Sequence, residues 1–284
     1  NADLVIFSPA VTADNPELKE AKKKGIKCLS YPQALGELTK QYFTIAISGT
    51  HGKSTSAAMI GLLLVRAGLD PTVIVGTKLK EFSGGNCRVG KSKYLVIEAD
   101  EYMASFLNYW PKIIVLTTIE EDHLDYFKNL NNILKTFKKY IGHLPKNGVL
   151  VANGDDKNIQ RIISNFQQFG PKLTAEGFSI SNQFSIFNYQ LSKSKDVKKL
   201  REVLRVPGEH NISNALAALT VARILEIPDK ISFKALSQYK GSWRRFEMKQ
   251  LTINPEEEQA PYGAGTKRLT IISDYAHHPT EVKV

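Results

Sequence analysis

The chain alternates short apolar runs with polar segments that contain glycine, which is the pattern of an α/β protein. Its strongest section begins with an apolar strand at residues 43–48, followed by a glycine-containing turn and a helix over about 53–67. Gly68 ends this helix, and a further strand is expected at 72–75. Other apolar runs predict buried strands, each followed by polar or acidic residues, at 94–97, 113–117 and 149–152. We therefore expect a parallel sheet with ligands at the carboxyl ends of its strands.

Two further segments predict helices that cover such a sheet. Apolar residues recur at spacings of three and four along one helix face, at Leu130, Ile133, Leu134, Phe137, Tyr140, Ile141 and Leu144. An alanine-rich helix is expected over about 211–225. We interpret both as packing elements rather than binding surfaces.

At the two ends of the chain, the alternation of strands and helices is less regular. A strand at 3–7, a helix at 16–24 and a strand at 26–29 predict a βαβ arrangement before the central sheet. Past Gly241 the pattern changes to strands at 245–251 and 269–273. Residues 254–268, rich in Glu, Pro and Gly, predict a mobile loop between them.

Composition excludes several classes of protein. With 42% hydrophobic and 23% charged residues among 284, the chain has material for real cores, which argues against disordered and fibrous proteins. Its longest apolar stretches are far shorter than the ~20 residues of a membrane span, so we expect no membrane insertion. Two cysteines and no secretory signal favour a reducing cytoplasm. The net charge of +10 comes from scattered basic runs, which favours phosphorylated ligands over a nucleic-acid partner.

The sharpest local signal is Ser48-Gly49-Thr50-His51-Gly52-Lys53-Ser54-Thr55, where a strand gives way to a helix. Glycines turn backbone N–H groups inward, the helix start adds a positive dipole, and Lys53 supplies a charge for phosphates. The Ser54 hydroxyl suits Mg²⁺. The loop is shorter than the common pattern, which has four residues between its glycines. A plain glycine-rich turn is the alternative interpretation.

Acidic residues follow two of the predicted strands. Glu98-Ala99-Asp100-Glu101 comes after one, and the segment 120–125, which includes Asp122 and His123, comes after another. Convergence on the phosphate loop would make these groups ligands for Mg²⁺, which prefers carboxylates and water. A single carboxylate could instead cap the next helix, and His123 alone could be an ordinary turn histidine.

Six blocks follow one another along the chain: GTHGKST (49–55), EADEY (98–102) with Ser105-Phe106-Leu107, TTIEEDHLD (117–125), GEHNISNALAA (208–218), Arg244-Arg245-Phe246, and DYAHHPTE (274–281). In these ordered blocks the chain resembles the Mur ligases, ATP-dependent amide-forming enzymes of bacterial cell-wall synthesis. Within the family they look most like the branch that joins L-alanine to UDP-N-acetylmuramate. The recycling branch, which adds a murein tripeptide to the same sugar nucleotide, is the alternative. A second alternative is a truncated ATP-binding protein without ligase activity.

The resemblance implies a role for each block. ATP would bind at Gly49, Thr50, His51, Gly52, Lys53, Ser54 and Thr55, with Mg²⁺ held by Ser54, Glu101 and His123. Catalytic roles would fall to Lys53, Glu101, His123 and Arg245. His210, Asn211, Asn214 and Asp274 would also contact the nucleotide, and Tyr275, His277 and His278 would contact substrate. Without the resemblance, the 210–214 block could be a packing helix, and His277-His278 a turn with two solvent-facing histidines.

The resemblance also implies a domain plan. We expect a central P-loop-type parallel sheet domain at 43–241, flanked by partial Rossmann-like N-terminal and C-terminal domains. Residues 1–42 would be part of the UDP-sugar-binding domain, and 242–284 the start of the third domain, so that the chain would be an internal fragment. Two departures stand out. Thr118 replaces the usual Asn, and neither Lys135 nor Lys138 can be assigned as the carbamylated lysine of some members.

Overall fold

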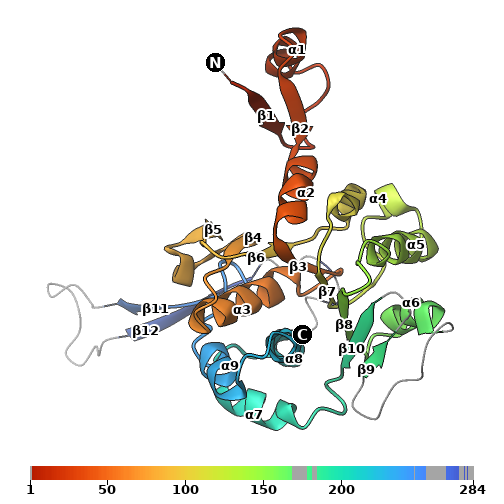
Figure 1. Ribbon diagram of the computed structural model, residues 1–284. Helices are drawn as coiled ribbons and strands as arrows, with labels where there is room; N and C mark the ends of the chain where they lie inside the picture. The colour runs from red at the N-terminus through yellow and green to blue at the C-terminus, as the bar shows by residue number, and fades with distance from the viewer. Residues whose placement is uncertain are drawn as a thin grey trace, which may run out of the picture.

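The chain builds one large sheet with helices on both faces, together with two small two-stranded sheets (Figure 1). A computed structural model describes residues 2–167, 178–180, 184–245, 247–253, 267–274, 278 and 280. Most of the predicted loop, residues 254–266, lies outside the described residues, so that prediction stays open.

The predicted strands and helices of the central region and both ends are present, with shifts of a few residues at their boundaries. The strands are β1 (Leu4–Phe7), β2 (Lys27–Ser30), β3 (Phe43–Ser48), β4 (Thr72–Leu79), β5 (Gly85–Arg88), β6 (Tyr94–Glu98), β7 (Ile113–Leu116), β8 (Val149–Asn153), β9 (Phe178–Ile180), β10 (Ser185–Tyr189), β11 (Glu247–Ile253) and β12 (Lys267–Ser273). The α-helices are α1 (Pro16–Lys23), α2 (Tyr31–Gln41), α3 (Lys53–Arg66), α4 (Leu124–Phe127), α5 (Leu130–Ile141), α6 (Lys157–Gln167), α7 (Asp196–Val203), α8 (Glu209–Ile224) and α9 (Asp229–Leu236). Two 3₁₀ segments, η1 (Lys80–Phe82) and η2 (Tyr102–Asn108), complete the described elements.

The large sheet has eight strands in the order β5-β4-β6-β3-β7-β8-β10-β9. The six inner strands run parallel, and only the edge strands β5 and β9 are antiparallel to their neighbours. This confirms the α/β class and the predicted parallel sheet. Because β3 lies between β6 and β7, the loop after β3 and the acidic segments after its two neighbours leave the sheet at the same edge.

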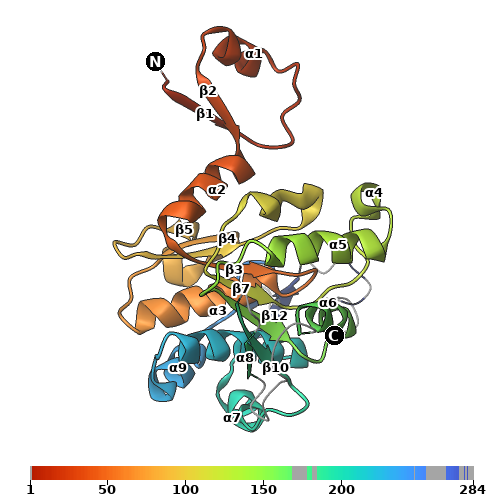
Figure 2. The same cartoon turned by 45° about the vertical axis from the view of Figure 1, so that its right-hand side comes forward.

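Each inner strand contributes side chains to two hydrophobic cores, one on each face of the sheet. Ile45 and Ile47 of β3 pack with α3, α8 and α9, whereas Ala46 between them packs with α5 and α6 on the opposite face. Strand side chains alternate between faces, so a strand buried on both sides reads as a continuous apolar run. Figures 1 and 2 show the same division, with α3, α8 and α9 on one side of the sheet and α5 and α6 on the other.

The N-terminal strands form a separate unit at the far end of α2 (Figure 2). β1 and β2 pair in parallel with α1 between them, as the sequence predicts. Ser30 begins α2 with a capping box to Gln33, which fixes the direction in which the helix runs back to the large sheet. At the other end of the chain, β11 and β12 pair as an antiparallel ribbon. Within the described part of the chain, no helix combines the length and apolar character needed to cross a membrane.

Candidate functional site: a phosphate loop facing acidic strand ends

The loop between β3 and α3 depends on two glycines in conformations that side chains rarely adopt. Gly49 has φ +135° and Gly52 has φ +83°. A Cβ on Gly49 would also lie 2.7 Å from the Thr118 carbonyl oxygen, so only glycine fits there. Gly52 caps α3 without a side chain, which leaves the N–H groups of the first turn open to an anion.

Lys53 is held at the mouth of this loop. Its Nζ donates to the carbonyl oxygens of Gly49 at 2.7 Å and Thr50 at 3.2 Å, and pairs with Glu101 Oε2 at 2.9 Å. Only 13% of the Lys53 side chain and 3% of the Glu101 side chain are exposed. The structure therefore brings the predicted phosphate-binding lysine and the predicted metal ligand into direct contact.

Burial and neighbouring charges shift the pKa values of both groups. Burial raises the pKa of Glu101 to about 7, and although Lys53 opposes the shift, the nearby Asp100 carboxylate adds to it. Burial by itself lowers the pKa of Lys53, but the carboxylates of Glu101 and Asp100 outweigh it and raise that pKa. Lys53 therefore stays cationic at neutral pH, as binding of an oligophosphate requires.

Glu98, the last residue of β6, links Ser54 to the neighbouring strand β4. The Ser54 hydroxyl donates to Glu98 Oε1 at 2.9 Å, and Glu98 Oε2 accepts from the Gly76 amide at 2.7 Å. Because the hydroxyl acts as donor to the carboxylate, its oxygen lone pairs are available to a cation. The sequence pattern placed Glu98 among the possible Mg²⁺ ligands, but it did not predict this link between Ser54 and Gly76.

A candidate metal centre lies beside Lys53. Ligand atoms of Asp100, Glu101 and His123 all fall within 4.8 Å of one another. His123 has φ +51°, and its ring packs on Tyr102 at a centroid distance of 4.5 Å. The two carboxylates make this an oxygen-rich set, which suits Mg²⁺ or Mn²⁺. The residues present thus fit the predicted metal.

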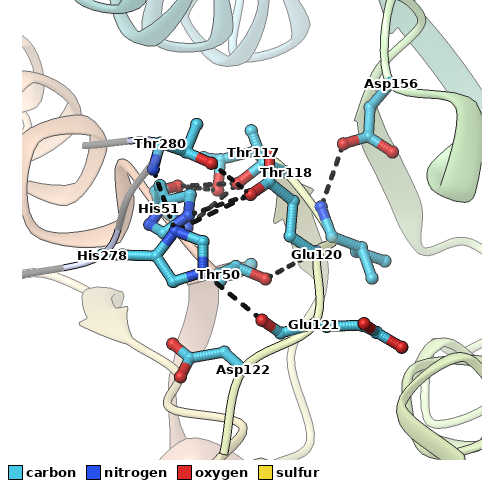
Figure 3. A network of polar contacts seen from close by, with 12 residues as sticks. Thr50, His51, Thr117, Thr118, Glu120, Glu121, Asp122, Asp156, His278 and Thr280 are labelled. Carbon is cyan, nitrogen blue, oxygen red and sulfur yellow. Dashed lines mark hydrogen bonds and ion pairs between the residues drawn. The ribbon is translucent and has the colours of Figure 1, made fainter. Parts of the chain in front are cut away.

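The end of β7 fixes the loop from the other side (Figure 3). Thr118 accepts from the Thr50 amide through its carbonyl oxygen at 2.8 Å and from the His51 amide through its hydroxyl at 3.0 Å. The Glu120 amide in turn donates to the Thr50 hydroxyl at 2.9 Å. The hydroxyl of Thr118, which departs from the family pattern, therefore still provides a hydrogen-bonding group to the loop.

The start of α8 lies behind the loop. Asn214 is buried, and its Oδ1 accepts from the Ser56 hydroxyl of α3 at 3.0 Å. Asn211 donates to the Pro207 carbonyl oxygen at 2.6 Å. Burial lowers the pKa of His210, and Asp274 from the end of β12 partly opposes this shift. Of the predicted residues of α8, Asn214 thus contacts the start of α3, whereas Asn211 bonds to the segment before α8 and Asp274 acts electrostatically on His210.

The remaining predicted residues have different placements. Arg245 lies after α9, where its amide donates to Ser242 and its charge acts on buried Tyr239. His278 lies at the phosphate loop, with its ring centroid 4.6 Å from that of His51 (Figure 3). Tyr275 and His277 fall outside the described residues.

In the large parallel sheet, the central strand β3 is followed by a glycine-containing loop and by helix α3, whose first residue is Lys53. Acidic residues at the ends of the neighbouring strands face this loop. These features define an α/β protein of the class that binds nucleotide phosphates. Residues 47–222 match the Mur ligase middle domain, and residues 1–43 match a second domain described as "Mur ligase family, catalytic domain". The chain belongs to the Mur ligase family.

Curated relatives and solved structures agree with this assignment. The UDP-N-acetylmuramate–L-alanine ligases of Clostridium botulinum (strain Okra) and Clostridium acetobutylicum are 40% and 41% identical over 99% and 100% of the chain. The chain spans 60% of the length of each. The fold is similar to that of the UDP-N-acetylmuramate-alanine ligase from Thermotoga maritima, with a TM-score of 0.72, 23% identity, and coverage of 99% of this chain and 62% of that one. It is also similar to the UDP-N-acetylmuramate:L-alanyl-gamma-D-glutamyl-meso-diaminopimelate ligase from Neisseria meningitides, with a TM-score of 0.66, 24% identity, and coverage of 86% and 80%.

Proposed function

We propose that this chain is the nucleotide-binding core of a ligase that joins L-alanine to the lactyl carboxylate of UDP-N-acetylmuramate in peptidoglycan precursor synthesis. The Mur ligases are ATP-dependent amide ligases, and the observation that carries the proposal here is the buried Lys53–Glu101 pair at the uncapped start of α3. The names of the relatives at 40% and 41% identity support L-alanine over a peptide as the amine.

The reaction has two steps. A lactyl carboxylate oxygen attacks the γ-phosphorus of ATP, the bond to the bridging oxygen breaks, and ADP leaves an acyl phosphate behind. The amine of L-alanine then attacks the acyl carbon, loses a proton, and displaces inorganic phosphate. Both steps spread negative charge over phosphate oxygens, so the work of the protein is positioning and charge neutralisation.

The residues of the loop suit that work. The first-turn N–H groups of α3 would bind phosphate oxygens, and the Lys53 ammonium would neutralise charge on the transferring group. Asp100, Glu101, His123 and the Ser54 hydroxyl would hold Mg²⁺, which supplies further neutralisation when bound. No side chain is needed as a nucleophile, so Cys28 and Cys87 need no catalytic role.

Residues further from the loop complete the proposed site. We assign His210, Asn211 and Asn214 to the adenine end, where burial keeps the His210 imidazole neutral and able to contact a base. Arg245, Asp274, Tyr275, His277 and His278 are proposed to close over ATP and the incoming amine. The domain boundaries proposed are 1–42, 43–241 and 242–284. Since ATP and UDP-sugars are cytoplasmic metabolites, the proposal places the protein in the cytoplasm.

The test is phosphate release from ATP by the full-length protein with UDP-N-acetylmuramate present. We expect release that depends on L-alanine, and loss of that release in a folded Lys53→Met variant. Release only with the murein tripeptide would move the protein to cell-wall recycling. ATP binding without release for either amine would contradict the ligase proposal and leave a nucleotide-binding protein.

A further inference from the structure

A second cluster of metal-binding side chains borders the phosphate loop and shares no residue with the cluster of Asp100, Glu101 and His123. It consists of His51 from the loop, Glu120 after β7 and His278 from the C-terminal segment, and their ligand atoms lie within 4.8 Å of one another. His51 Nε2 is 3.4 Å and His278 Nδ1 is 3.9 Å from Glu120 Oε2. Figure 3 shows the two imidazoles and the carboxylate facing one another.

The surroundings hold these side chains in place. Only 14% of the His51 and 21% of the His278 side chain are exposed. Thr280 donates its hydroxyl to Glu120 Oε2 at 2.7 Å, which orients the carboxylate toward the histidines. The three groups come from segments far apart in the sequence. Burial and the hydrogen bond from Thr280, as well as their mutual contacts, hold them in position.

The hydrogen bonds of His278 favour the tautomer that binds a metal. Its Nε2 lies 3.4 Å from the Glu121 carbonyl oxygen, which can only accept, so Nε2 carries the proton. Nδ1 is then the unprotonated nitrogen, and it lies 3.9 Å from Glu120 Oε2. The Thr280 amide donates a long hydrogen bond of 3.3 Å to the same nitrogen, and a bound metal would replace that bond. An imidazole whose second nitrogen donates to a carbonyl is the usual arrangement for a histidine ligand.

The distances and the donor set select the kind of metal. Tetrahedral zinc with bonds of about 2.0–2.2 Å needs donor atoms about 3.3–3.6 Å apart. The His51–Glu120 distance of 3.4 Å lies in this range, the His278–Glu120 distance of 3.9 Å lies just above it, and all three ligand atoms are within 4.8 Å of one another. Two imidazoles and one carboxylate suit Zn²⁺, Co²⁺ or Ni²⁺, whereas Mg²⁺ prefers oxygen ligands. Three protein ligands leave a fourth position open.

We propose that His51, Glu120 and His278 bind a transition-metal dication of the zinc type, which ties the C-terminal segment to the phosphate loop. This site is distinct from the candidate magnesium centre, because it shares none of the three residues Asp100, Glu101 and His123. The inference does not rest on the proposed ligase reaction, since binding of the metal needs neither ATP nor the sugar nucleotide.

The test is titration of the full chain with Co²⁺, followed by the visible absorption of the bound ion. Excess Mg²⁺ is kept present so that the oxygen-rich centre does not contribute. We expect about one equivalent of tightly bound Co²⁺, and binding weakened at least about tenfold in His51→Ala, Glu120→Gln and His278→Ala. Far-UV circular dichroism checks that each variant is folded. If His51→Ala does not fold, His278→Ala carries the test.

Two control variants keep the outcome specific. His123→Ala removes a ligand of the other cluster, and His143→Gln removes a histidine that stacks on Trp110 at a centroid distance of 4.4 Å. Both should bind Co²⁺ as the wild type does. Wild-type affinity in folded His51→Ala and His278→Ala variants, or loss of binding only in His123→Ala, would overturn the proposal.

Discussion

Among single residues, the Lys53–Glu101 pair carries most of the functional argument. A buried ion pair adds little stability, because removing both charges from water costs about as much as their attraction returns. Such a pair is better explained by its location, where a cation and a carboxylate lie ready for phosphate and metal. The phosphate-loop pattern predicted Lys53, the strand ends predicted the acidic segment 98–101, and the resemblance to the Mur ligases singled out Glu101 within it. The sequence did not predict that the two would contact each other.

Breaking this pair should make stability depend on pH. In metal-free Lys53→Met, the pKa of Glu101 should rise above its wild-type value of about 7, because the opposing cation is gone. A carboxyl with a raised pKa destabilises the fold increasingly as pH rises. We expect Lys53→Met/Glu101→Gln to be more stable than Lys53→Met by about 1–3 kcal/mol at pH 8, with the difference shrinking toward pH 5. Urea unfolding in EDTA measures it, and equal stability at both pH values would count against a buried Glu101.

Gly49 offers a sharp steric prediction. Gly49→Ala combines φ +135° with a Cβ 2.7 Å from the Thr118 carbonyl oxygen, and should cost more than about 2 kcal/mol. Gly68→Ala is the matched control, because Gly68 has φ +76° but nothing within 4 Å of its Cβ position. That substitution should cost about 1 kcal/mol. Thermal unfolding compares the two, and an equal loss in both would show that the close approach to Thr118 is unimportant.

At the scale of elements, the long apolar runs were predictable and so were helices α1, α3, α5 and α8, whereas α2 was not. Pro32 and Gly36 are typical turn residues, so the pattern did not predict α2. The structure shows why both are accepted: Pro32 lies in the first turn, and Gly36 packs directly against Asn108. The hydrogen bond between Asn214 of α8 and Ser56 of α3 could not be predicted either, because it joins residues 158 positions apart.

Three helices are joined by a charge network whose contribution should depend on pH. Arg223 of α8 bonds to Asp196 of α7 at 2.8 Å and to Asp229 of α9 at 2.8 Å. The hydrogen bond from Arg223 lowers the pKa of Asp229, so its stabilisation is present above pH ~4 and is lost as pH falls through the lowered pKa. Solvent screens the network, because 41% of the Arg223 side chain is exposed. We expect Arg223→Met to cost about 1 kcal/mol at pH 7 and less at pH 3.

The exposed Arg201–Glu209 pair provides a comparison within the same protein. Its side chains are 55% and 56% exposed, so Arg201→Met should cost less than Arg223→Met. Denaturant unfolding at pH 7 and pH 3 measures both variants. A cost for Arg223→Met that does not change between these pH values would mean that packing of its stem, rather than the carboxylates, stabilises the helices.

For the whole molecule, the strand order decides what the sequence could and could not predict. The pattern predicted a parallel sheet and convergent strand ends, but the place of β3 between β6 and β7 depends on long-range pairing that periodicity does not encode. The same holds for His278, which lies 227 positions (278 − 51) from His51 in the chain and 4.6 Å from it in space. The motif DYAHHPTE marked the residue without indicating what it contacts.

The central claim is that the loop over 49–55 binds nucleotide phosphate through Lys53. Calorimetric titration of this chain with Mg²⁺-ATP tests it most directly, with Lys53→Met as the variant and Lys135→Met as a folded control that removes a lysine of α5 away from the loop. We predict saturable binding by the wild type and the control, and weakening by about 10- to 150-fold in Lys53→Met, the loss of one charge-assisted contact. Equal affinity in wild type and Lys53→Met would contradict the account.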